Sequence, residues 1–440
     1  MRSAFTDTSG IFTRSYSTQV CKELSGLRNA RDLRFNNTFI TGRRIVLAKN
    51  DWKGKLSNPT KDPSACQLQM TSHSTTRYKV AVLGCTGSVG QRFIQLLENH
   101  PWFEVVAVGA SSRSAGQKYS QACRWKQSTP LPNYVKDMEI RECKASEFPE
   151  VDIVFSGLSN QVAGDIEEEF AASGKAVFSN AKNHRMDPDV PILIPAVNAS
   201  HIGLIEYQRR KRGWDKGFIV TNANCSTTAL CLGLKPILDR FGIEAMIVTT
   251  MQAISGAGYP GLPSMDIIDN VVPFIGGEEP KMESESLKIF GHLDTEKIVP
   301  ASIKVSAMCN RVHVLDGHTE CVSLKLKTRA TCEQVIQAIE QFPPFTRSLQ
   351  LPSSPERDVV YTDWIDRPQP RLDRHTGNGF TVTLGRVREC SVMDIKLVLF
   401  GHNTVVGAAG GSIINAELSV AKGFIAQKGK QSVYAAVSRH

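Results

Sequence analysis

The sequence lacks the features that mark zinc-binding, disulfide-rich and membrane-spanning proteins. Its 11 cysteines include no C-x-x-C pair and no Cys/His cluster at the spacing of a zinc site. Their odd number and scattered positions predict a reducing compartment without a disulfide framework. No apolar run approaches the ~20 residues of a membrane span. A hydrophobic content of 41% and a charged content of 22% are typical of a soluble globular protein.

A basic groove is also lacking, although the formal net charge is +9. Residues 1–70 hold 12 Lys/Arg and 5 Asp/Glu, so the other 370 residues carry only +2. We therefore expect neither a nucleic-acid nor a membrane partner.

Residues 1–76 lack sustained hydrophobic periodicity, which predicts a basic, disordered extension outside the catalytic part. Their Ser, Thr, Asn and Arg content with few acids also resembles an organellar transit peptide. An upstream extension of the gene model, with the natural start at Met70, is a third interpretation. The expected location is cytoplasmic, with an organellar location as the alternative.

What is present after residue 77 is the pattern of a doubly wound parallel sheet. Apolar runs at 78–84 and 104–109 predict strands, with a glycine-rich turn and a helix over 91–98 between them. Further short apolar runs are expected to extend this Rossmann-type sheet, at 152–155, 176–178 and 192–194.

From residue 243 the runs become longer and alternate between apolar and polar residues. Alternation predicts an antiparallel or mixed sheet, and the amphipathic helices between the runs indicate an α+β second domain. The expected strands lie at 244–250, 305–314, 319–327, 380–386 and 393–400, and the helices near 282–290 and 331–342. Residues 343–378, rich in Pro, Asp and Arg, are expected to be loop.

The chain offers a candidate nucleophile in Thr221-Asn-Ala-Asn-Cys-Ser-Thr-Thr-Ala-Leu230. A short strand is expected before this stretch and an amphipathic helix after it, so Cys225 is expected at the start of the helix. Unpaired backbone N–H groups and the positive end of the helix dipole favour a thiolate there. A small buried core residue is the alternative interpretation of Cys225.

A glycine turn, Gly84-x-x-Gly87-x-x-Gly90, stands between the first expected strand and helix. Glycines there allow the pyrophosphate of a dinucleotide to approach the helix N-terminus. The spacing is a variant of G-x-G-x-x-G, and an ordinary strand-to-helix turn is the alternative.

The second expected strand does not end in the acid that an NAD-specific site carries. Hydroxyl groups and a guanidinium stand there instead, and they suit a 2′-phosphate. The sequence therefore predicts NADP rather than NAD, bound by Ser111, Ser112, Arg113 and Ser114.

A nucleophilic thiol with a nicotinamide cofactor indicates aldehyde oxidation through a thioester, which needs a base. His318 lies at the end of an expected strand, where a histidine is more often structural. Arg311, seven residues earlier, makes this segment a candidate site, because a guanidinium can clamp a carboxylate.

Taken in order, these motifs resemble aspartate-β-semialdehyde dehydrogenases of the branch found in archaea and fungi. The resemblance extends over about residues 78–424 and nearly all of the expected folded part. Besides Arg311 and His318, it rests on residues 83–91, 222–228, 252–258, 278–282 and 407–411.

The resemblance implies a role for each matching residue. Cys225 is the implied nucleophile, His318 the implied acid/base, and Gln252 a glutamine beside the nucleophile. Arg311 is implied to bind the substrate α-carboxylate and Glu278 its α-amino group. Groups around the phosphate are implied to be Lys281, Asn224 and Arg185.

The resemblance also implies cofactor contacts and no metal. Cys85 stands where alanine is usual, and Val406 stands where a basic residue often precedes the last glycine-rich segment. The implied contacts are Gly84, Thr86, Gly87, Ser88, Val89, Gly90, Ser255, Gly256 and Gly407.

The implied activity is NADP-dependent reductive dephosphorylation of 4-phospho-L-aspartate to L-aspartate 4-semialdehyde through a cysteine thioacyl intermediate. The resemblance places it in the route to homoserine, threonine and methionine, in a homodimer or homotetramer. Alternatives are an N-acetylglutamyl-phosphate reductase, a glyceraldehyde-phosphate dehydrogenase or another phosphorylating aldehyde dehydrogenase, and a non-enzymatic NADP-sensing module. Glu278 favours a free amine over an acetylated one, and an intact Cys225 argues against a sensing module.

The expected organisation has an NADP-binding Rossmann domain over 77–222 and a catalytic and dimerisation domain over 223–403. A C-terminal helix over 404–425 is expected to pack back on the first domain, followed by a tail over 426–440.

Overall fold

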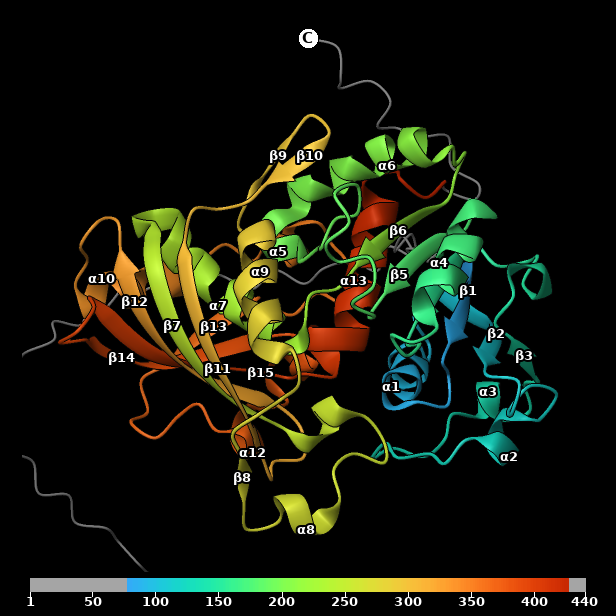
Figure 1. Cartoon of the computed structure of the whole chain (residues 1–440), viewed down its shortest axis with the longest axis horizontal. Coiled ribbons are helices and arrows are strands. Elements are labelled where there is room, and N and C mark those ends of the chain that lie inside the picture. The colour runs from blue at the N-terminus through green and yellow to red at the C-terminus, as the bar shows by residue number, and fades with distance from the viewer. Residues whose placement is uncertain (1–76, 427–440) are drawn as a thin grey trace, which may run out of the picture. The chain divides into compact units, whose positions relative to one another are not determined.

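The computed structural model describes residues 77–426, so the expected extension over 1–76 and the tail from 427 lie outside the described residues. Its first sheet has the strand order β3-β2-β1-β4-β5-β6, and every pairing is parallel (Figure 1). Strands of such a sheet are buried on both faces, which explains their continuous apolar sequences. They are β1 (Tyr78–Leu83), β2 (Phe103–Ala110), β3 (Ile140–Glu142), β4 (Ile153–Ser156), β5 (Ala176–Ser179) and β6 (Phe218–Thr221).

Helices cover both faces of the first sheet. On one face, α1 (Ser88–Leu96) and α13 (Gly410–Ala421) share a core with β1 and β2. On the other face, Phe170 and Ala171 of α4 (Ala163–Ala172) pack on the remaining side chains of the same strands. The other helices here are α2 (Tyr119–Ala122), α3 (Asn133–Lys136), η1 (Ala145–Glu147), α5 (Pro195–Asn198), η2 (Ala199–Gly203) and α6 (Leu204–Arg212).

The second sheet is mixed and has the order β13-β14-β15-β12-β7-β11-β8. With the parallel first sheet, it confirms the expected α/β class. Its long strands alternate between buried and exposed residues, because helices cover only one face. The strands are β7 (Ile243–Gln252), β8 (Val271–Val272), β11 (Lys304–Val312), β12 (His318–Leu326), β13 (Val359–Thr362), β14 (Val382–Glu389) and β15 (Ile395–Gly401), beside a hairpin of β9 (His292–Asp294) and β10 (Lys297–Val299).

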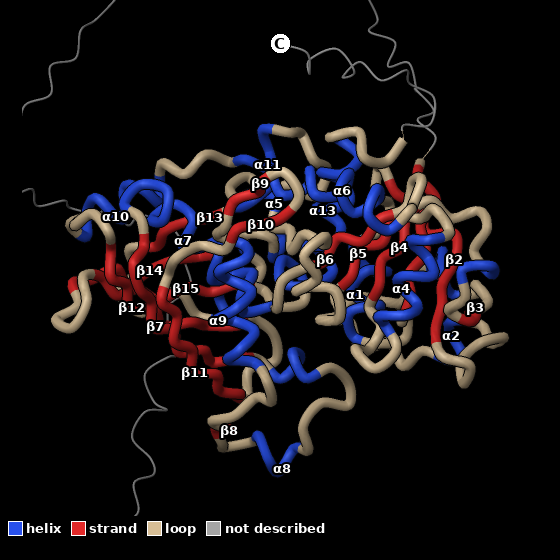
Figure 2. Tube along the Cα trace, turned by 45° about the horizontal axis from the view of Figure 1, so that its top comes forward, coloured by secondary structure: helices blue, strands red, loops and turns tan. Residues whose placement is uncertain are grey.

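The covered face of the second sheet carries α7 (Cys225–Phe241), α9 (Glu278–Ile289) and α10 (Cys332–Glu340). Leu230, Leu234 and Ile237 of α7 are fully buried against this sheet, as their helical spacing predicts. The short α8 (Ser264–Ile267) projects from the second sheet next to its edge strand β8 (Figure 2). Other short helices are η3 (Ile254–Ala257), α11 (Phe345–Ser348), α12 (Pro370–Asp373), η4 (Thr376–Gly379) and the π-helical η5 (Val405–Ala409).

Some expected elements differ in the structure. The strand expected at 192–194 is wrong: only an isolated bridge joins Ile192 to Thr221. Asn198 explains the difference, because its side chain donates to the Ile192 carbonyl and accepts from the Ile194 N–H. The region 343–378 is not all loop, since it contains β13, α11, α12 and the start of η4. Among the described helices, none is long and apolar enough to cross a bilayer.

Candidate active site

Cys225 is the first residue of α7, and its position is set by Asn224. The Asn224 side-chain oxygen caps the helix by accepting from the N–H groups of Ser226 and Thr227, at 3.0 and 3.3 Å. The asparagine that ends the β6–α7 turn therefore fixes where the helix, and with it the thiol, begins.

His318 faces the thiol from the first position of β12. Its Nε2 lies 3.1 Å from the Sγ of Cys225, and its Nδ1 accepts a hydrogen bond from the Ala253 N–H at 3.0 Å. A neutral imidazole that accepts at Nδ1 carries its proton on Nε2. Burial, and secondarily the charge of Arg311, lower the pKa of His318 to about 3. The ring is therefore neutral at pH 7 and presents an N–H to the sulfur.

The position of Cys225 at the helix start predicts a lowered pKa, and this prediction is wrong. Burial raises this pKa to about 12, and the carboxylate of Glu278 adds to the rise. Arg311, Arg185 and the Ser226 N–H act in the opposite direction but do not outweigh burial. Because a buried anion loses its hydration, the thiol form prevails in this state.

Glu278 and Lys281 lie on the first turn of α9 and meet the N-terminus of α7. One carboxylate oxygen of Glu278 accepts from the Asn224 side-chain amide at 2.7 Å, and the other accepts from Lys281 Nζ at 3.1 Å. Glu278 is 5% exposed. Its negative charge therefore acts on the thiol at close range, in a poorly hydrated setting.

Arg311 and Gln252 are opposite each other on the paired strands β11 and β7. The Nη1 of Arg311 donates to the Ala253 carbonyl at 2.8 Å, and Gln252 bonds to Thr250 Oγ1 at 3.3 Å. A Cβ on Gly256 would lie 2.6 Å from that same Nη1 and 3.3 Å from His318 Cε1, so a side chain there would displace the Arg311 guanidinium. The structure thus brings Arg311, His318 and Gly256 together.

Arg185 is engaged by a buried acid and a backbone carbonyl. Its Nη1 forms a buried ion pair with Glu285 at 3.0 Å, and its Nη2 donates to the Asn180 carbonyl at 2.8 Å. The second oxygen of Glu285 accepts from the Asn224 N–H at 2.6 Å. Among the described residues, Arg185 Nε has no hydrogen-bond partner. Arg185 therefore reaches the helix start through Glu285.

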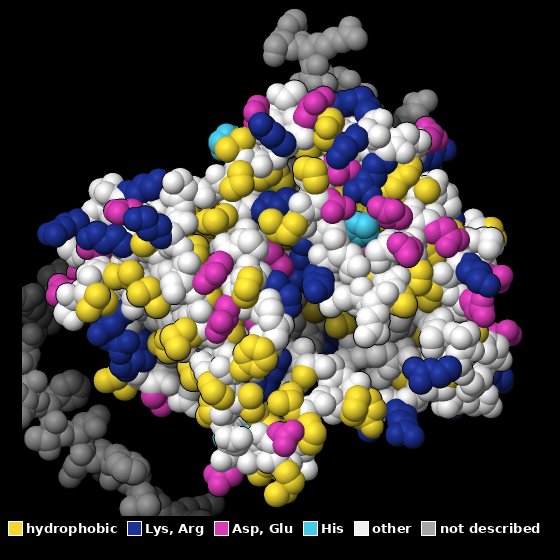
Figure 3. All heavy atoms as spheres, viewed as in Figure 1, with side chains coloured by type: hydrophobic (Ala, Val, Ile, Leu, Met, Phe, Trp, Pro, Cys, Tyr) yellow, Lys and Arg dark blue, Asp and Glu magenta, His cyan; other side chains and the backbone are white. Residues whose placement is uncertain are grey.

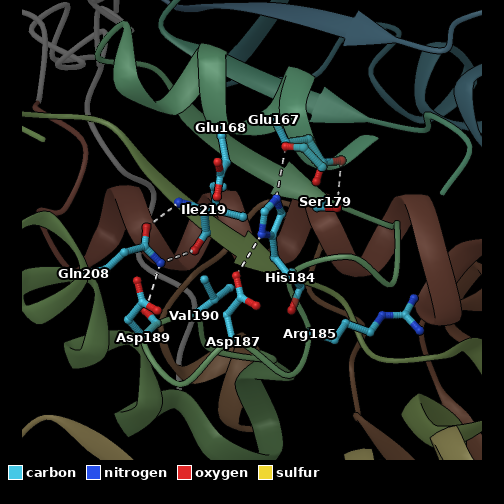
Figure 4. A network of polar contacts seen from close by, with 12 residues as sticks. Glu167, Glu168, Ser179, His184, Arg185, Asp187, Asp189, Val190, Gln208 and Ile219 are labelled. Carbon is cyan, nitrogen blue, oxygen red and sulfur yellow. Dashed lines mark hydrogen bonds and ion pairs between the residues drawn. The ribbon is translucent and has the colours of Figure 1, made fainter. Parts of the chain in front are cut away.

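The segment that carries Arg185 is held from several sides. His184 contacts the Gly164 carbonyl at 3.2 Å and the Asp187 carboxylate at 2.9 Å, while Arg185 points away from both (Figure 4). Lys288 of α9 donates to the carbonyls of residues 185, 187 and 190 at 2.7, 2.8 and 2.7 Å. Burial lowers the pKa of Lys288 to about 8.

The glycine turn joins β1 to α1 with very little space. A Cβ on Gly90 would lie 2.3 Å from the Gly84 carbonyl oxygen, and one on Gly84 would lie 2.5 Å from that of Gly157. At Gly87 the nearest such atom is 3.4 Å away, so the middle of the turn is open. The implied contacts Thr86, Ser88 and Val89 belong to this turn and the first turn of α1.

The other implied cofactor residues lie in three places. Ser111, Ser112 and Arg113 are exposed directly after β2, with Ser114 partly exposed beside them. Ser255 accepts from the Asn403 side chain at 2.9 Å. A Cβ on Gly407 would lie 3.1 Å from that of Cys225, so this glycine packs against the thiol residue.

Two buried acids near the thiol were missed in the sequence. Glu285 follows Glu278 by two helical turns, a spacing that is a usable signal for one face of α9. Glu320 follows His318 by two residues, so both point to the same face of β12. Neither oxygen of Glu320 has a hydrogen-bond partner among the described residues, and burial raises its pKa well above the usual value. Within residues 77–426, no cluster of His, Cys, Asp or Glu has the composition of a metal site.

Basic side chains border a hollow in the middle of the face shown in Figure 3. A parallel sheet with a glycine turn at a helix start, together with a thiol–imidazole pair, defines a class of protein. That class is the nicotinamide-dependent oxidoreductases that use a cysteine nucleophile.

Comparisons with known proteins narrow the class to one family. The family model for the semialdehyde dehydrogenase NAD-binding domain matches residues 79–205, and that for the dimerisation domain matches residues 234–406. An aspartate-semialdehyde dehydrogenase of Trichophyton rubrum is 49% identical over 358 residues, 80% of this chain and 99% of that protein. One from Methanothermobacter thermautotrophicus is 52% identical over 341 residues, 77% of this chain and 98% of that protein.

A solved structure agrees with these relatives. The crystal structure of aspartate-semialdehyde dehydrogenase with NADP from Candida albicans has a TM-score of 0.74 at 48% identity, covering 80% of this chain and 100% of that one. The chain therefore belongs to the aspartate-semialdehyde dehydrogenase family, which confirms the resemblance seen in its motifs.

Proposed function

We propose that this chain catalyses the NADPH-dependent reductive dephosphorylation of 4-phospho-L-aspartate to L-aspartate 4-semialdehyde. The observation that carries the proposal is the contact between Cys225 Sγ and His318 Nε2 at the start of α7. Family membership supplies the substrate, and a buried cation and a buried anion beside the thiol, Arg311 and Glu278, suit its α-carboxylate and α-amino groups.

The first step belongs to Cys225. Attack of its sulfur on the acyl carbon forms a C–S bond and breaks the bond from that carbon to the phosphate oxygen, and the thiol proton leaves with the phosphate. Glu278 raises the pKa of the thiol, so a substrate ammonium that neutralises Glu278 favours this attack. Substrate binding and activation of the nucleophile are thereby linked.

The second step depends on His318. Bound NADPH supplies the hydride that reduces the thioester carbonyl. The Nε2–H of His318 donates a hydrogen bond first to the carbonyl oxygen as it becomes negative and then to the sulfur, which leaves as a thiolate when the C–S bond breaks. A proton from solution restores the thiol, so one proton is consumed in each turnover.

For the phosphate we propose Lys281, Asn224 and Arg185 as contacts, with Gln252 beside the nucleophile. The unpartnered Nε of Arg185 supports its place in this set, although its Nη1 is engaged by Glu285. A phosphate that replaces Glu285 as the partner of Arg185 also affects the hydrogen bond that Glu285 accepts from the Asn224 N–H.

For NADP we propose the glycine turn as the pyrophosphate site and residues 111–114 as the 2′-phosphate site. The open position at Gly87 and the exposed side chains of Ser111, Ser112 and Arg113 fit these groups. Ser255, Gly256 and Gly407 lie near the thiol and suit the nicotinamide end.

We further propose that two copies pair through the second sheet, whose uncovered face exposes Ile247 and Met308. The match of residues 234–406 to a dimerisation domain supports this assembly. The domain boundaries at 222/223 and 403/404 are part of the same proposal. A cytoplasmic location fits the nine described cysteines, which are all free.

The test is phosphate-dependent reduction of NADP by L-aspartate semialdehyde, followed by absorbance. We expect turnover that requires both phosphate and the aldehyde, with N-acetylglutamate semialdehyde a poor substrate. Equal turnover of the acetylated aldehyde would contradict the assigned role of Glu278.

A further inference from the structure

A contact between the regions of the first and second sheets lies beside the glycine turn and has no part in the chemistry described above. It joins the chain after α2 to Tyr259, which follows η3. The Nζ of Lys126 lies 5.0 Å from the centre of the Tyr259 ring. A hydrogen bond from Arg124, and then the charge of Lys126, lower the pKa of Tyr259. Figure 1 shows the chain between α2 and α3 passing below α1 toward the segment before α8.

Gln91 fixes one side of this contact to the glycine turn. Its buried side-chain amide donates to the carbonyls of Thr86 and Arg124, at 2.9 and 3.1 Å. Its oxygen accepts from the Lys126 N–H at 2.7 Å. One amide therefore holds the backbone of residues 124–126 against Thr86, at the place where α1 begins.

The cations of this contact are not neutralised by acids. Arg124 and Lys126 are exposed, and neither belongs to an ion pair within residues 77–426. Two such cations beside a helix N-terminus raise the local positive potential. This arrangement favours an anion with more than one negative charge.

The other side of the contact is attached to the thiol site. Tyr259 follows the loop that contains Gly256, where an added Cβ would meet Arg311 and His318. Tyr259 lies between Gly258 and Gly261, whose φ angles are +73° and +81°, and a Cβ on Gly258 would meet nothing within 4 Å. Backbone of this kind is accessible mainly to glycine and allows a local change of direction.

We propose that Arg124, Lys126 and Tyr259 form a clamp that closes over the pyrophosphate of the bound dinucleotide. This inference rests on the proposed binding of NADP. The two cations bind the phosphate oxygens, and Tyr259 holds them while tying the glycine turn to the loop beside the thiol. The pyrophosphate is favoured over the 2′-phosphate because Gln91 holds the backbone of residues 124–126, which carries the cations, next to Thr86, whereas residues 111–114 follow a different strand.

The double variant Arg124→Gln/Lys126→Gln tests the clamp by fluorescence titration with NADPH and NADH. We expect the Kd for both dinucleotides to rise by the same factor, about 10-fold or more, because both carry the pyrophosphate. Tyr259→Leu should speed NADPH dissociation several-fold in stopped flow. The matched control is Tyr207→Leu, which removes the ring that lies 6.0 Å from Lys211 on α6 and should leave both quantities unchanged.

Unchanged Kd values in the double variant would overturn the clamp and leave a contact between the two sheet regions only. A loss confined to NADPH would overturn the pyrophosphate assignment, since NADH lacks the 2′-phosphate. If the wild-type chain binds neither dinucleotide, the proposed function fails and the clamp fails with it.

Discussion

The two halves of the candidate site are built in different ways. The cofactor half is made mainly of backbone, in the short turn between β1 and α1, and of exposed side chains that follow β2. The thiol site is made of buried side chains from α7, α9, β7, β11 and β12, and it depends on partners far apart in the sequence. A local backbone site tolerates change at its rim, whereas a buried side-chain site does not, because each lost partner leaves a charge unpaired.

The substitution Cys225→Ala should separate the two halves most clearly, because it should abolish turnover and leave cofactor binding intact. We expect turnover to fall by more than about 10⁴-fold, because no other group can form the thioester. The Kd for NADPH should stay within about twofold, since the glycine turn is untouched. Initial rates and fluorescence titration measure the two effects. Appreciable steady-state turnover in this variant would rule out the covalent mechanism.

Arg311→Lys keeps a positive charge in the thiol half but loses the planar, two-pronged donor. We expect kcat/KM for the aldehyde to fall about 100-fold, because a misplaced α-carboxylate shifts the reacting carbon from the sulfur. An aldehyde without the α-carboxylate should be a poor substrate and little affected by the change. If wild type and variant discriminate equally between the two aldehydes, Arg311 does not bind the carboxylate.

Arg113→Ala is the corresponding change in the cofactor half. We expect KM for NADPH to rise about 10-fold while KM for NADH stays constant, because only NADPH carries the 2′-phosphate. Lys118→Ala, a nearby exposed cation already paired with Asp137, is the control. A parallel rise in KM for both cofactors would show that Arg113 does not bind the 2′-phosphate.

Glu278→Gln tests how one buried charge controls the thiol. Removing the negative charge lowers the pKa of Cys225, so alkylation by iodoacetamide at pH 8 should accelerate, by about 10-fold for each unit of pKa. The adjacent Glu279→Gln is the control, because the Glu279 carboxylate accepts from the Cys309 N–H instead. Identical alkylation rates in wild type and Glu278→Gln would show that this carboxylate does not hold the thiol protonated.

The smallest effect concerns stability against pH. The pKa of His318 is about 3 when folded, against about 6.5 unfolded, so between these values the unfolded chain binds one more proton. Stability is therefore lost as the pH falls below about 6.5. His318→Gln should reduce the slope of the free energy of unfolding against pH, by at most about 1.4 kcal/mol per unit. Urea denaturation between pH 4.5 and 7 measures this slope, and an unchanged slope would contradict a buried neutral imidazole.

The same contrast explains what the sequence could predict. The glycine turn and the start of α7 were readable because each is a local pattern of strand, turn and helix. The raised pKa of Cys225 was not readable, because it comes from burial under a second sheet and from Glu278, 53 positions away in the chain. The Arg185–Glu285 pair could not be predicted either, since no spacing in the sequence relates residues 100 positions apart.

The strand predicted for the apolar run at 192–194 is wrong for a similar reason. Three consecutive apolar residues satisfy a strand pattern, and the side chain that removes them from the sheet, Asn198, lies outside it. A polar residue that binds backbone groups four to six positions earlier is therefore a signal that competes with hydrophobic pattern.

Lys288 makes the path of one segment depend on the other half of the molecule. Residues 185–190 belong to the chain that forms the first sheet, yet three of their carbonyls are satisfied by one ammonium group from α9. Without α9, these carbonyls would be hydrated, and the segment would lose the three hydrogen bonds that hold it in place. The path of residues 185–190 therefore depends on a helix that covers the second sheet. The active site is complete only when a lysine from one half has replaced the water around the backbone of the other.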